Sequence, residues 1–314
     1  MRAAVMFAGA AGSSLGARDA GAEVIWAANH EPLSIAVHQA NFPTAEHVCE
    51  DLVRYDHGEM PEHDLLIASP VCRGHSPAGR PGRKKNPKIA SKHNRYRATA
   101  WSVLDALEIH EPGGAVIENV DDWRAWPLYQ GWLRCVQDLG YTTSELLLTA
   151  SRWGVPQRRT RLFVVATRKR VWLEPSLRDR YAPEPGMRDC VDWDSGEWMP
   201  FSEAGGDVFR EQLEDAHRQF RGAACFVQLV DGRPVFGADE PLRTMTTKDQ
   251  LRWVHRKRFR YPTARELFRL MGFGDDYVIP PDVEASRTAA TALAGDAVCP
   301  PVMRAIVERM AAAL

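Results

Sequence analysis

The sequence has 314 residues, of which 45% are hydrophobic, and its 40 Lys and Arg residues nearly balance its 41 Asp and Glu residues, giving a net charge of -1. This composition fits a globular protein with a full core and excludes the fibrous and disordered classes. The balanced charge also excludes a protein that binds nucleic acid over its whole surface, because such proteins carry an excess of basic residues.

No segment reaches the roughly eighteen uninterrupted apolar residues of a membrane helix, and the apolar run at the start of the chain is too short for a signal peptide. We therefore expect a cytoplasmic protein with no membrane partner. The chain has six cysteines, namely Cys49, Cys72, Cys135, Cys190, Cys225 and Cys299. None of them forms a Cys-x-x-Cys pair, so we expect neither a metal site nor a disulfide framework.

Short apolar runs alternate with helical periods through the first half of the chain. The strand-like runs cover residues 3–9, 22–29, 63–70, 114–120 and, later, 161–167. The helical segments between them cover residues 13–21, 33–42 and 97–110. This alternation predicts an α/β fold with a mainly parallel sheet that helices cover on both faces.

Beyond the last of these strands the alternation weakens, and Pro, Asp, Trp and Arg become frequent. We interpret residues 169–284 as a second, smaller and less regular domain. An amphipathic helix is predicted at residues 264–273, and the apolar stripe of residues 300–314 predicts a last helix that returns to the first domain. The first domain then comprises residues 1–168 and 285–314.

The first predicted strand runs into FAGAAGSSLG, a stretch of small residues. Small residues let the backbone turn tightly and present amide groups at the start of a helix, which suits a charged or polar ligand group. The run Gly9-Ala10-Ala11-Gly12 lacks the G-x-G-x-x-G spacing of a dinucleotide site, so a nicotinamide cofactor is disfavoured.

Polar side chains follow the second predicted strand, at Asn29, His30 and Glu31. Ligands of open parallel sheets bind beyond the carboxyl ends of the strands, so these side chains are candidates to meet the same ligand. Alternatively, Asn29 and Glu31 only cap the helix that follows.

Cys72 follows the apolar strand at residues 63–70 in the stretch SPVCRGHS, on the same ligand-binding edge. Residues 73–97 contain many Lys and Arg and no acidic residue. Such charge stabilises a thiolate, whose reference pKa is about 8.5, and makes it a better nucleophile. Two alternatives stay open: Cys72 as a small buried hydrophobic residue, and the basic segment as a solvated loop that contacts no phosphate.

Glu118 ends another apolar strand, where partial burial raises the pKa of a carboxyl group toward the range useful for proton donation. Arg158, Arg159 and Arg161 lie at the start of the last predicted strand. Alternation along a strand predicts that Arg159 and Arg161 share one face, where a carboxylate such as Glu118 is a suitable partner. A helix-capping role for the segment around Glu118 and a purely structural ion pair are the alternatives.

Together these motifs resemble the DNA (cytosine-5) methyltransferase family, in order and across nearly the whole chain. The matching segments are FAGAAGSSLG at 7–16, EDL at 50–52, SPVCRGHS at 69–76, IENV at 117–120, QRRTR at 157–161, PLRTMTT at 241–247 and AGDAVCPPV at 294–302. The resemblance implies a Rossmann-like class I methyltransferase fold with a small target-recognition domain. It also implies a DNA (cytosine-5-)-methyltransferase that uses S-adenosylmethionine.

The resemblance implies that Phe7 stacks on the adenine of the cofactor, that His30 is a second stacking side chain, and that Asp51 meets the adenine amino group. The full set implied for cofactor binding is Phe7, Ala8, Gly9, Gly12, Asn29, His30, Glu31, Asp51, Leu52, Pro70, Asp296, Ala297 and Val298.

For catalysis, the resemblance implies that Cys72 adds to carbon 6 of cytosine and that Glu118 hydrogen-bonds or protonates ring nitrogen 3. Arg159 and Arg161 would hold the carbonyl of the base and the carboxylate. Because the reacting atom lies inside stacked DNA, the target base must first leave the duplex.

The implied partner is double-stranded DNA, bound by a monomer, and the presence of a cognate restriction nuclease stays open. The residues implied to contact DNA are Arg73, Ser76, Arg80, Arg83, Lys84, Lys85, Lys88 and Gln157. Residues from about 169 to 240 would read the target sequence in the major groove.

Some positions depart from the family pattern. Val71 stands where the family has the proline before the nucleophile, and Ala11 stands for a glycine of the first loop. Asn29 occupies the place of a glutamate that accepts the ribose hydroxyls, and Asp296 replaces an asparagine. Because Asn29 can donate a hydrogen bond where glutamate cannot, a modified, carboxylated cofactor is an alternative to S-adenosylmethionine.

Three other functions stay open. The tRNA-methylating branch of the family has a reduced recognition domain, and the roughly seventy residues between VVAT and PLRTM favour DNA over tRNA. An inactive DNA-binding regulator is disfavoured because Cys72, Glu118 and the arginines of QRRTR are all present. A Rossmann-type oxidoreductase is disfavoured by the broken glycine pattern.

Overall fold

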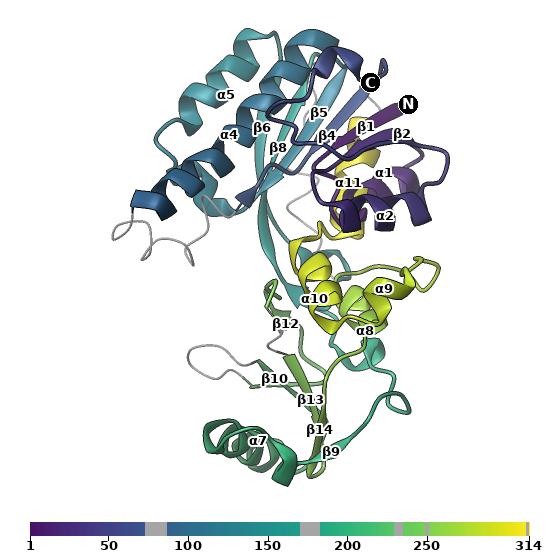
Figure 1. The fold of residues 1–314 in the computed structure, drawn as a ribbon, viewed down its shortest axis with the longest axis vertical. Coiled ribbons are helices and arrows are strands. Elements are labelled where there is room, and N and C mark those ends of the chain that lie inside the picture. Colours follow the sequence, from purple (N-terminus) through teal and green to yellow (C-terminus); the bar gives the residue numbers. More distant parts are fainter. Residues whose placement is uncertain (73–86, 170–182, 229–234, 249–250, 312–313) are drawn as a thin grey trace. The chain divides into compact units, whose positions relative to one another are not determined.

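The computed structural model describes residues 1–72, 87–169, 183–228, 235–248, 251–311 and 314, with the backbone alone at 87–95 (Figure 1). The chain divides into two compact units. The first comprises Met1–Thr149, Thr160–Arg180 and Val298–Leu314, and the second comprises Ala150–Arg159 and Tyr181–Ala297. These divisions differ from the sequence-based boundaries mainly because residues 150–159 and 285–297 group with the second unit. Which unit carries which function stays a prediction.

A seven-stranded sheet forms the centre of the first unit, in the order β3-β2-β1-β4-β5-β8-β6. Its strands are β1 (Arg2–Met6), β2 (Glu23–Ala28), β3 (Glu46–Val48), β4 (Leu65–Ala68), β5 (Gly114–Asn119), β6 (Thr142–Thr149) and β8 (Thr160–Thr167). The first five strands pair in parallel, and β8 runs antiparallel to both β5 and β6. All residues of β4 and β5 are buried, as expected of central strands in a sheet covered on both faces. The predicted α/β fold with a mainly parallel sheet is confirmed.

Helices cover both faces of this sheet (Figure 1). On one side lie α4 (Pro87–His110) and α5 (Tyr129–Asp138), and on the other lie α1 (Gly12–Asp19), α2 (Pro32–Asn41) and α11 (Pro300–Met310). On the side of α4 the core joins Val103, Leu107 and Trp132 from the helices to Met6 and Ile117 from the strands. Full burial of such side chains stabilises the fold by about 1.5–3 kcal/mol each.

Two strands and one α-helix of the first unit were not predicted from the sequence: β3, β6 and α5. The strand β3 has only three residues, and β6 lies at the edge of the sheet with Thr, Ser and Glu along much of its length. Neither shows the continuous apolar run on which the strand predictions depended.

The second unit has its own five-stranded sheet, in the order β11-β10-β13-β14-β9. Its strands and helices are β9 (Met199–Pro200), α7 (Asp207–Gln219), β10 (Cys225–Gln228), β11 (Val235–Gly237), β13 (Leu251–His255), β14 (Arg258–Arg260), α8 (Ala264–Arg269), α9 (Pro281–Glu284) and α10 (Arg287–Asp296). Short strands β7 (Gln157–Arg158) and β12 (Leu242–Arg243) pair in parallel. Leu213 and Ala216 of α7 pack on Val227, Val254 and Phe259 of the sheet. This part of the chain is more regular than the sequence indicated.

Short 3-10 helices complete both units. They are η1 (His57–Glu59), η4 (Asp121–Ala125), η5 (Ala150–Trp153), η6 (Arg188–Cys190) and η7 (Phe201–Glu203).

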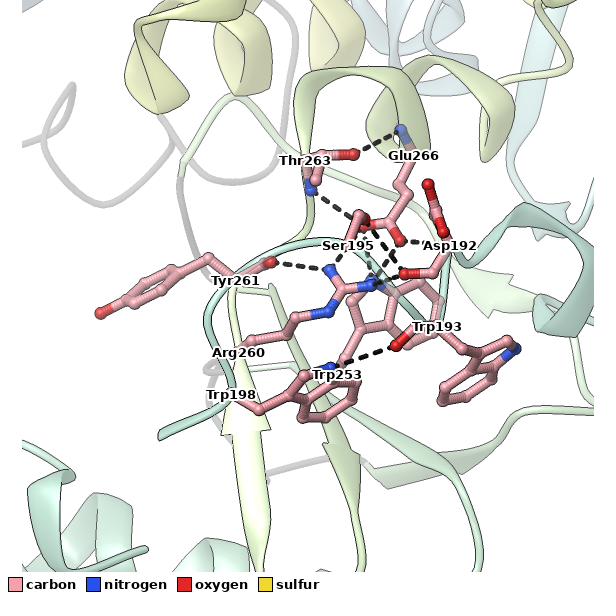
Figure 2. Close-up of polar contacts among 9 residues, drawn as sticks. All are labelled: Asp192, Trp193, Ser195, Trp198, Trp253, Arg260, Tyr261, Thr263 and Glu266. Carbon is pink, nitrogen blue, oxygen red and sulfur yellow. Dashed lines mark hydrogen bonds and ion pairs between the residues drawn. The ribbon is translucent and has the colours of Figure 1, made fainter. Parts of the chain in front are cut away.

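A buried ion pair joins β14 to α8 in the second unit (Figure 2). Nη1 and Nη2 of Arg260 donate to the carboxylate of Glu266 at 2.8 and 2.6 Å, and the two side chains are 1% and 0% exposed. The same carboxylate accepts from Trp253 Nε1 at 3.1 Å and from the backbone amides of Asp192 at 2.7 Å and Thr263 at 2.8 Å. Burying a charge is costly unless its hydrogen bonds are satisfied, so this network specifies how the loop, the strand and the helix meet.

The segment Arg287–Met310 is, by length and composition, apolar enough to cross a membrane. It consists of two separate helices, α10 with 10 residues and α11 with 11 residues. Neither reaches the about 20 residues that a membrane-spanning helix needs. Of its most apolar window, 72% is buried inside the protein, as in an ordinary core helix, so the segment is weak evidence for a membrane span.

Candidate active site

The first unit brings several predicted site residues to one edge of its sheet. Met6 and Ala68 are paired at the carboxyl ends of β1 and β4. The chain leaves β1 toward β2 and β3 on one side and leaves β4 toward β5 on the other. In open α/β sheets, ligands bind beyond the carboxyl ends of the strands at such a reversal of strand order. The segments that begin at Phe7 and Ser69 both start at this point.

The segment after β1 turns sharply into α1. Phe7 and Ala11 have φ of 58° and 62°, in the left-handed region that favours glycine. The left-handed conformation costs a non-glycine residue on the order of 1–2 kcal/mol, which explains the glycine of the family pattern at position 11. Ala8 N donates to Ala28 O at 2.9 Å, which ties the turn to β2. A Cβ atom at Gly9 would meet nothing within 4 Å, so the space beside this turn is open. Backbone amides at the start of a helix, as here at α1, suit a charged or polar ligand group.

The first turn of α1 is held by two histidines. Ser14 Oγ and His38 Nε2 are hydrogen-bonded at 2.7 Å, and His38 Nδ1 and His47 Nε2 at 2.8 Å. Burial lowers the pKa of His38 from 6.5 to about 3, with a smaller contribution from His47, and burial also lowers the pKa of His47. Both rings are therefore neutral near pH 7, and His38 links α1 to α2 without a charge.

Acidification is expected to weaken the first unit through His38. The unfolded chain protonates this histidine below pH 6.5, whereas the folded chain does so only near pH 3. The free energy of unfolding therefore falls as the pH drops below 6.5, by about 1.4 kcal/mol per pH unit. Between pH 7 and pH 5 the loss is about 2 kcal/mol, or roughly 4–8 °C in melting temperature.

The variant His38→Gln keeps hydrogen-bonding groups but does not titrate. Between pH 7 and pH 5 its free energy of unfolding is therefore expected to fall by about 2 kcal/mol less than that of the parent. Melting temperatures at pH 7 and pH 5 check this, with the exposed residue His30 changed to glutamine (His30→Gln) as the control. Equal acid-induced losses in the parent and in His38→Gln would contradict the prediction.

The predicted cofactor residues after β2 and β3 take part in local turns. Asn29 Oδ1 accepts from the backbone amide of Glu31 at 2.9 Å, and Asp51 Oδ1 accepts from Val53 N at 3.1 Å. The exposed side chains of His30 and Glu31 lie together, with His30 Nε2 at 3.2 Å from Glu31 Oε1. The side chain of Glu31 makes no capping hydrogen bond to α2. The alternative that Asn29 and Glu31 cap the following helix therefore does not hold for the side chain of Glu31. Asn29 makes a turn directly before this helix.

Cys72 differs from the other cysteines in exposure. Cys190, Cys225 and Cys299 are buried, Cys49 and Cys135 are exposed, and Cys72 is intermediate. Burial raises the pKa of the Cys190 and Cys225 thiols to about 12 each, so neither forms a thiolate near neutral pH. The exposure of Cys72 does not match a small buried hydrophobic residue.

A hydrogen bond joins β5 to the segment that leads to Cys72. Asn119 Nδ2 donates to Pro70 O at 2.9 Å, and Asn119 Oδ1 accepts from Val120 N at 2.9 Å. Both ends of this buried amide are engaged, so its two partners define its orientation. Cys72 therefore lies two residues from a point that is fixed to the strand carrying Glu118.

Glu118 and Arg161 form an ion pair, with Arg161 Nε at 3.2 Å from Glu118 Oε1 and the side chains 10% and 17% exposed. Because β8 starts at Thr160 and runs antiparallel to β5, Arg161 lies at the carboxyl end of β5. An ion pair that is shielded from water orients both of its groups. Glu118 belongs to β5 and not to the following η4, so the helix-capping alternative does not apply.

Arg159 does not share a strand face with Arg161, and that expectation is wrong. The strand β8 begins at Thr160, so Arg159 lies outside it. Arg159 groups with the second unit, where Nη1 donates to Met245 O at 3.1 Å and Nη2 to Gly295 O at 2.8 Å. These contacts brace the backbone of the second unit.

Gln157, which was predicted to contact DNA, is a buried link within the second unit. It is 0% exposed, its Nε2 donates to Leu270 O at 3.1 Å, and its Oε1 accepts from Met245 N at 2.9 Å. Because backbone groups occupy both ends of the amide, the side chain braces the segment after β12 and does not reach solvent. Burial of this kind corrects the prediction of a DNA contact.

The late motif lies at the end of α10 and the start of the last segment of the first unit. A Cβ atom at Gly295 would lie 2.4 Å from Thr246 O, so only glycine permits this close approach. Asp296 is exposed, whereas Ala297 and Val298 are buried. The chain passes from the second unit to the first between Ala297 and Val298.

Several predicted residues lie outside the described residues, namely Arg73, Ser76, Arg80, Arg83, Lys84 and Lys85. Lys88 lies in α4, where only the backbone is described. Within the described part of the chain, no group of three or more His, Cys, Asp or Glu side chains is arranged to hold a metal ion.

Two residues that were not selected from the sequence contact the segment before Cys72. Asn119 belongs to the IENV motif, so the motif itself was the signal that marked it. Thr99 Oγ1 accepts from Val71 N at 3.1 Å, across 28 positions of sequence. A single sequence carries no signal for a contact of this kind.

Comparisons of the sequence with known proteins identify a family and several relatives. The sequence model of the family described as C-5 cytosine-specific DNA methylase matches residues 1–187 and 214–312. The chain is 25% identical to Type II methyltransferase M.NlaX of Neisseria lactamica, over 98% of this chain and 96% of that protein. It is 26% identical to Type II methyltransferase M1.HphI of Haemophilus parahaemolyticus, over 96% of this chain and 84% of that protein.

Solved structures share the fold. The Dnmt2 methyltransferase of S. pombe has a TM-score of 0.70 at 16% identity, over 98% of this chain and 97% of that chain. The Entamoeba histolytica methyltransferase EhMeth has a TM-score of 0.70 at 16% identity, over 99% of this chain and 97% of that chain. At these identities the likeness shows the fold alone.

Proposed function

The chain belongs to the C-5 cytosine-specific DNA methylase family, and from that premise we propose the residues with which it methylates carbon 5 of cytosine in DNA. The enzyme is a DNA cytosine-5 methyltransferase that uses S-adenosylmethionine. Carbon 5 of cytosine is a poor nucleophile, so the ring must first gain electron density from an attacking group. S-adenosylmethionine supplies an electrophilic methyl group on a sulfonium centre.

Cys72 is the attacking group. Its thiolate adds to carbon 6, which makes carbon 5 enamine-like and able to attack the sulfonium methyl group, with S-adenosylhomocysteine as the leaving group. A base then removes the hydrogen from carbon 5, and elimination releases the thiolate of Cys72. Because no side chain reaches carbon 6 inside stacked DNA, the target base is first turned out of the duplex.

Attack at carbon 6 pushes electron density onto ring nitrogen 3, and Glu118, with its carboxyl group protonated, stabilises it by donating a hydrogen bond or its proton to that nitrogen. Arg161 holds the carboxylate in orientation, and the ion pair at 3.2 Å supports this role. For Arg159 the proposal is limited to bracing the second unit through Met245 and Gly295.

The observation that carries this assignment is the hydrogen bond from Asn119 Nδ2 to Pro70 O at 2.9 Å. It ties together two segments that are 49 positions apart in the chain. Glu118 directly precedes Asn119, and Cys72 follows Pro70 by two residues. An acid and a half-buried thiol are thereby held at the same edge of the sheet.

For the cofactor we propose residues that follow β1, β2, β3 and β4, together with the late motif at the end of α10. Phe7 and His30 stack on adenine, Asp51 meets the adenine amino group, and the open turn at Gly9 supports a charged group there. The remaining proposed residues are Ala8, Gly12, Asn29, Glu31, Leu52, Pro70, Asp296, Ala297 and Val298.

For the DNA we propose that the second unit reads the target sequence in the major groove and that the basic segment after Cys72 contacts phosphates. The proposal includes a monomer that acts in the cytoplasm on double-stranded DNA, with or without a cognate restriction nuclease.

Methyl transfer from labelled S-adenosylmethionine to genomic DNA and to tRNA tests the proposed function. We expect label in DNA as 5-methylcytosine, identified by mass spectrometry of the nucleosides, and none in tRNA. Label in tRNA alone would show that the substrate is tRNA and not DNA. A carboxymethyl group on the cytosine would show that the cofactor is carboxylated and is not S-adenosylmethionine. No label in either would favour an inactive DNA-binding relative.

A further inference from the structure

The peptide unit that joins Pro70 to Val71 is held from two sides. Its carbonyl oxygen accepts from Asn119 Nδ2 on β5 at 2.9 Å. Its amide, the N–H of Val71, donates to Thr99 Oγ1 on α4 at 3.1 Å. A peptide unit is planar and rigid, so these two contacts fix the orientation of the peptide between Pro70 and Val71. Cys72 is the next residue after Val71.

The donor and acceptor roles at Thr99 follow from its second contact. Thr99 Oγ1 donates to Tyr96 O at 2.7 Å, within the same helix. A hydroxyl has a single hydrogen, so its lone pairs are left to accept from the amide of Val71. Thr99 is 8% exposed and Asn119 is 1% exposed, so water competes little with either contact.

The chain needs such a contact because residue 71 is valine. The family pattern has proline there, whose ring fixes φ near −65° and which carries no amide hydrogen. Val71 has no such ring and adds a backbone donor that must find a partner. The hydroxyl of Thr99 satisfies this donor and restrains the backbone that a proline ring would otherwise restrain.

We propose that Thr99 is a positioning residue that holds Cys72 for attack on cytosine by fixing the peptide between Pro70 and Val71. It replaces, through a hydrogen bond, the restraint that the family pattern obtains from proline. This inference rests on the proposed role of Cys72 as the nucleophile. Thr99 acts through the backbone and touches neither the base nor the cofactor. Displacing a reacting group by about 1 Å costs on the order of 10²-fold in rate, so the effect of Thr99 is measurable.

The substitution Thr99→Val removes the hydroxyl at nearly constant volume. We expect it to lower kcat for DNA methylation about 10- to 100-fold, with the KM for DNA and for S-adenosylmethionine within about threefold of the parent. Thr99→Ser keeps the hydroxyl and is expected to stay within about threefold of the parental kcat. A purely structural role would lower the melting temperature of Thr99→Val and leave its kcat unchanged. A parental kcat in Thr99→Val therefore overturns the proposal.

Position 71 supplies two matched backgrounds. Val71→Pro removes the amide hydrogen, so adding Thr99→Val to it is expected to cost less than about threefold in kcat. Val71→Ala keeps the amide, so adding Thr99→Val is expected to cost the full factor of about 10 to 100. An equal cost in both backgrounds overturns the proposal, because Thr99 would then act through something other than this hydrogen bond.

If Val71→Pro does not fold, covalent capture decides. DNA that contains 5-fluorocytosine retains the adduct between Cys72 Sγ and carbon 6, because the fluorine cannot be removed as a proton is. The capture rate of Thr99→Val is expected to fall about 10-fold or more, and a parental rate overturns the proposal.

Cys72→Ser separates the two assignments. If Cys72→Ser methylates DNA at the parental rate, the assignment of the nucleophile fails and the role of Thr99 fails with it. If Cys72→Ser is inactive and Thr99→Val is fully active, only the role of Thr99 fails.

Discussion

Replacing Cys72 with serine is expected to lower methyl transfer to DNA on the order of 10⁴-fold or more. A serine hydroxyl is not ionised near neutral pH and is a far weaker nucleophile than a thiolate. Carbon 6 of cytosine is then not attacked, and carbon 5 stays unreactive toward the methyl group. Labelled methyl transfer measures the loss, and DNA binding and melting temperature, measured separately, show that the variant is folded.

Covalent capture gives an independent readout of the same assignment. With DNA that contains 5-fluorocytosine, mass spectrometry of the digested complex is expected to find the nucleotide on the peptide that carries Cys72. The control is Cys135→Ser, because Cys135 is an exposed cysteine of α5 in the same unit. That variant should methylate and form the adduct like the parent. An adduct in Cys72→Ser, or turnover near that of the parent, would contradict the assignment.

The sheet of the first unit was predictable because its central strands are apolar on both faces. All residues of LLIA in β4 and of GAVIEN in β5 are buried, and the sequence shows LLIA and the first four residues of β5 as continuous apolar runs. Parallel strands end at a common edge, which is why residues as far apart in sequence as Phe7, Asn29, Cys72 and Glu118 were expected at the same edge.

The starting point of a strand was less predictable than its existence. The alternation of Arg159 and Arg161 predicts a shared face only if one strand contains both residues. The strand β7 ends at Arg158 and β8 begins at Thr160, so Arg159 lies between two strands. There Arg159 O accepts from Ala150 N at 2.9 Å. That hydrogen bond comes from a residue nine positions earlier in the chain, and no local pattern in the sequence shows it.

The second unit was hard to predict because its sheet is assembled from short strands. The strands β9 and β14 have two and three residues, too few for an alternating pattern to appear. Their pairing joins segments that are far apart in sequence, such as Met199 with Phe259. The buried pair of Arg260 and Glu266 depends on the same long-range packing, so single-sequence patterns leave it hidden.

The contact between Val71 and Thr99 shows how a departure from a family pattern can be compensated elsewhere in the chain. From the sequence alone, the loss of a proline before Cys72 indicates a less restrained backbone. In the structure the additional amide hydrogen has a partner on α4. Whether a substitution weakens a site therefore depends on what lies beside the new group in space.

Replacing Glu118 with glutamine is expected to lower kcat for DNA methylation about 10²- to 10⁴-fold. Glutamine keeps the size of the side chain and can still accept a hydrogen bond from Arg161, but it cannot deliver a proton to ring nitrogen 3. Because negative charge develops on the ring during attack at carbon 6, the rate of capture by 5-fluorocytosine DNA should fall by a similar factor. The dissociation constant for DNA is expected to stay within about threefold of the parent, since this substitution removes no phosphate contact.

The matched control is Glu111→Gln, because Glu111 also forms an ion pair in the first unit, with Arg168 at 3.3 Å. Glu111 precedes β5, at the opposite edge of the sheet from Glu118, and its side chain is 66% exposed. Exposed ion pairs contribute only about 0–1 kcal/mol, so this variant should keep the parental kcat. A fall in kcat for both variants would indicate a general effect of charge on the unit. If the kcat of Glu118→Gln stays within about threefold of the parent, Glu118 does not take part in the attack on cytosine. Its role would then be the structural one of holding Arg161.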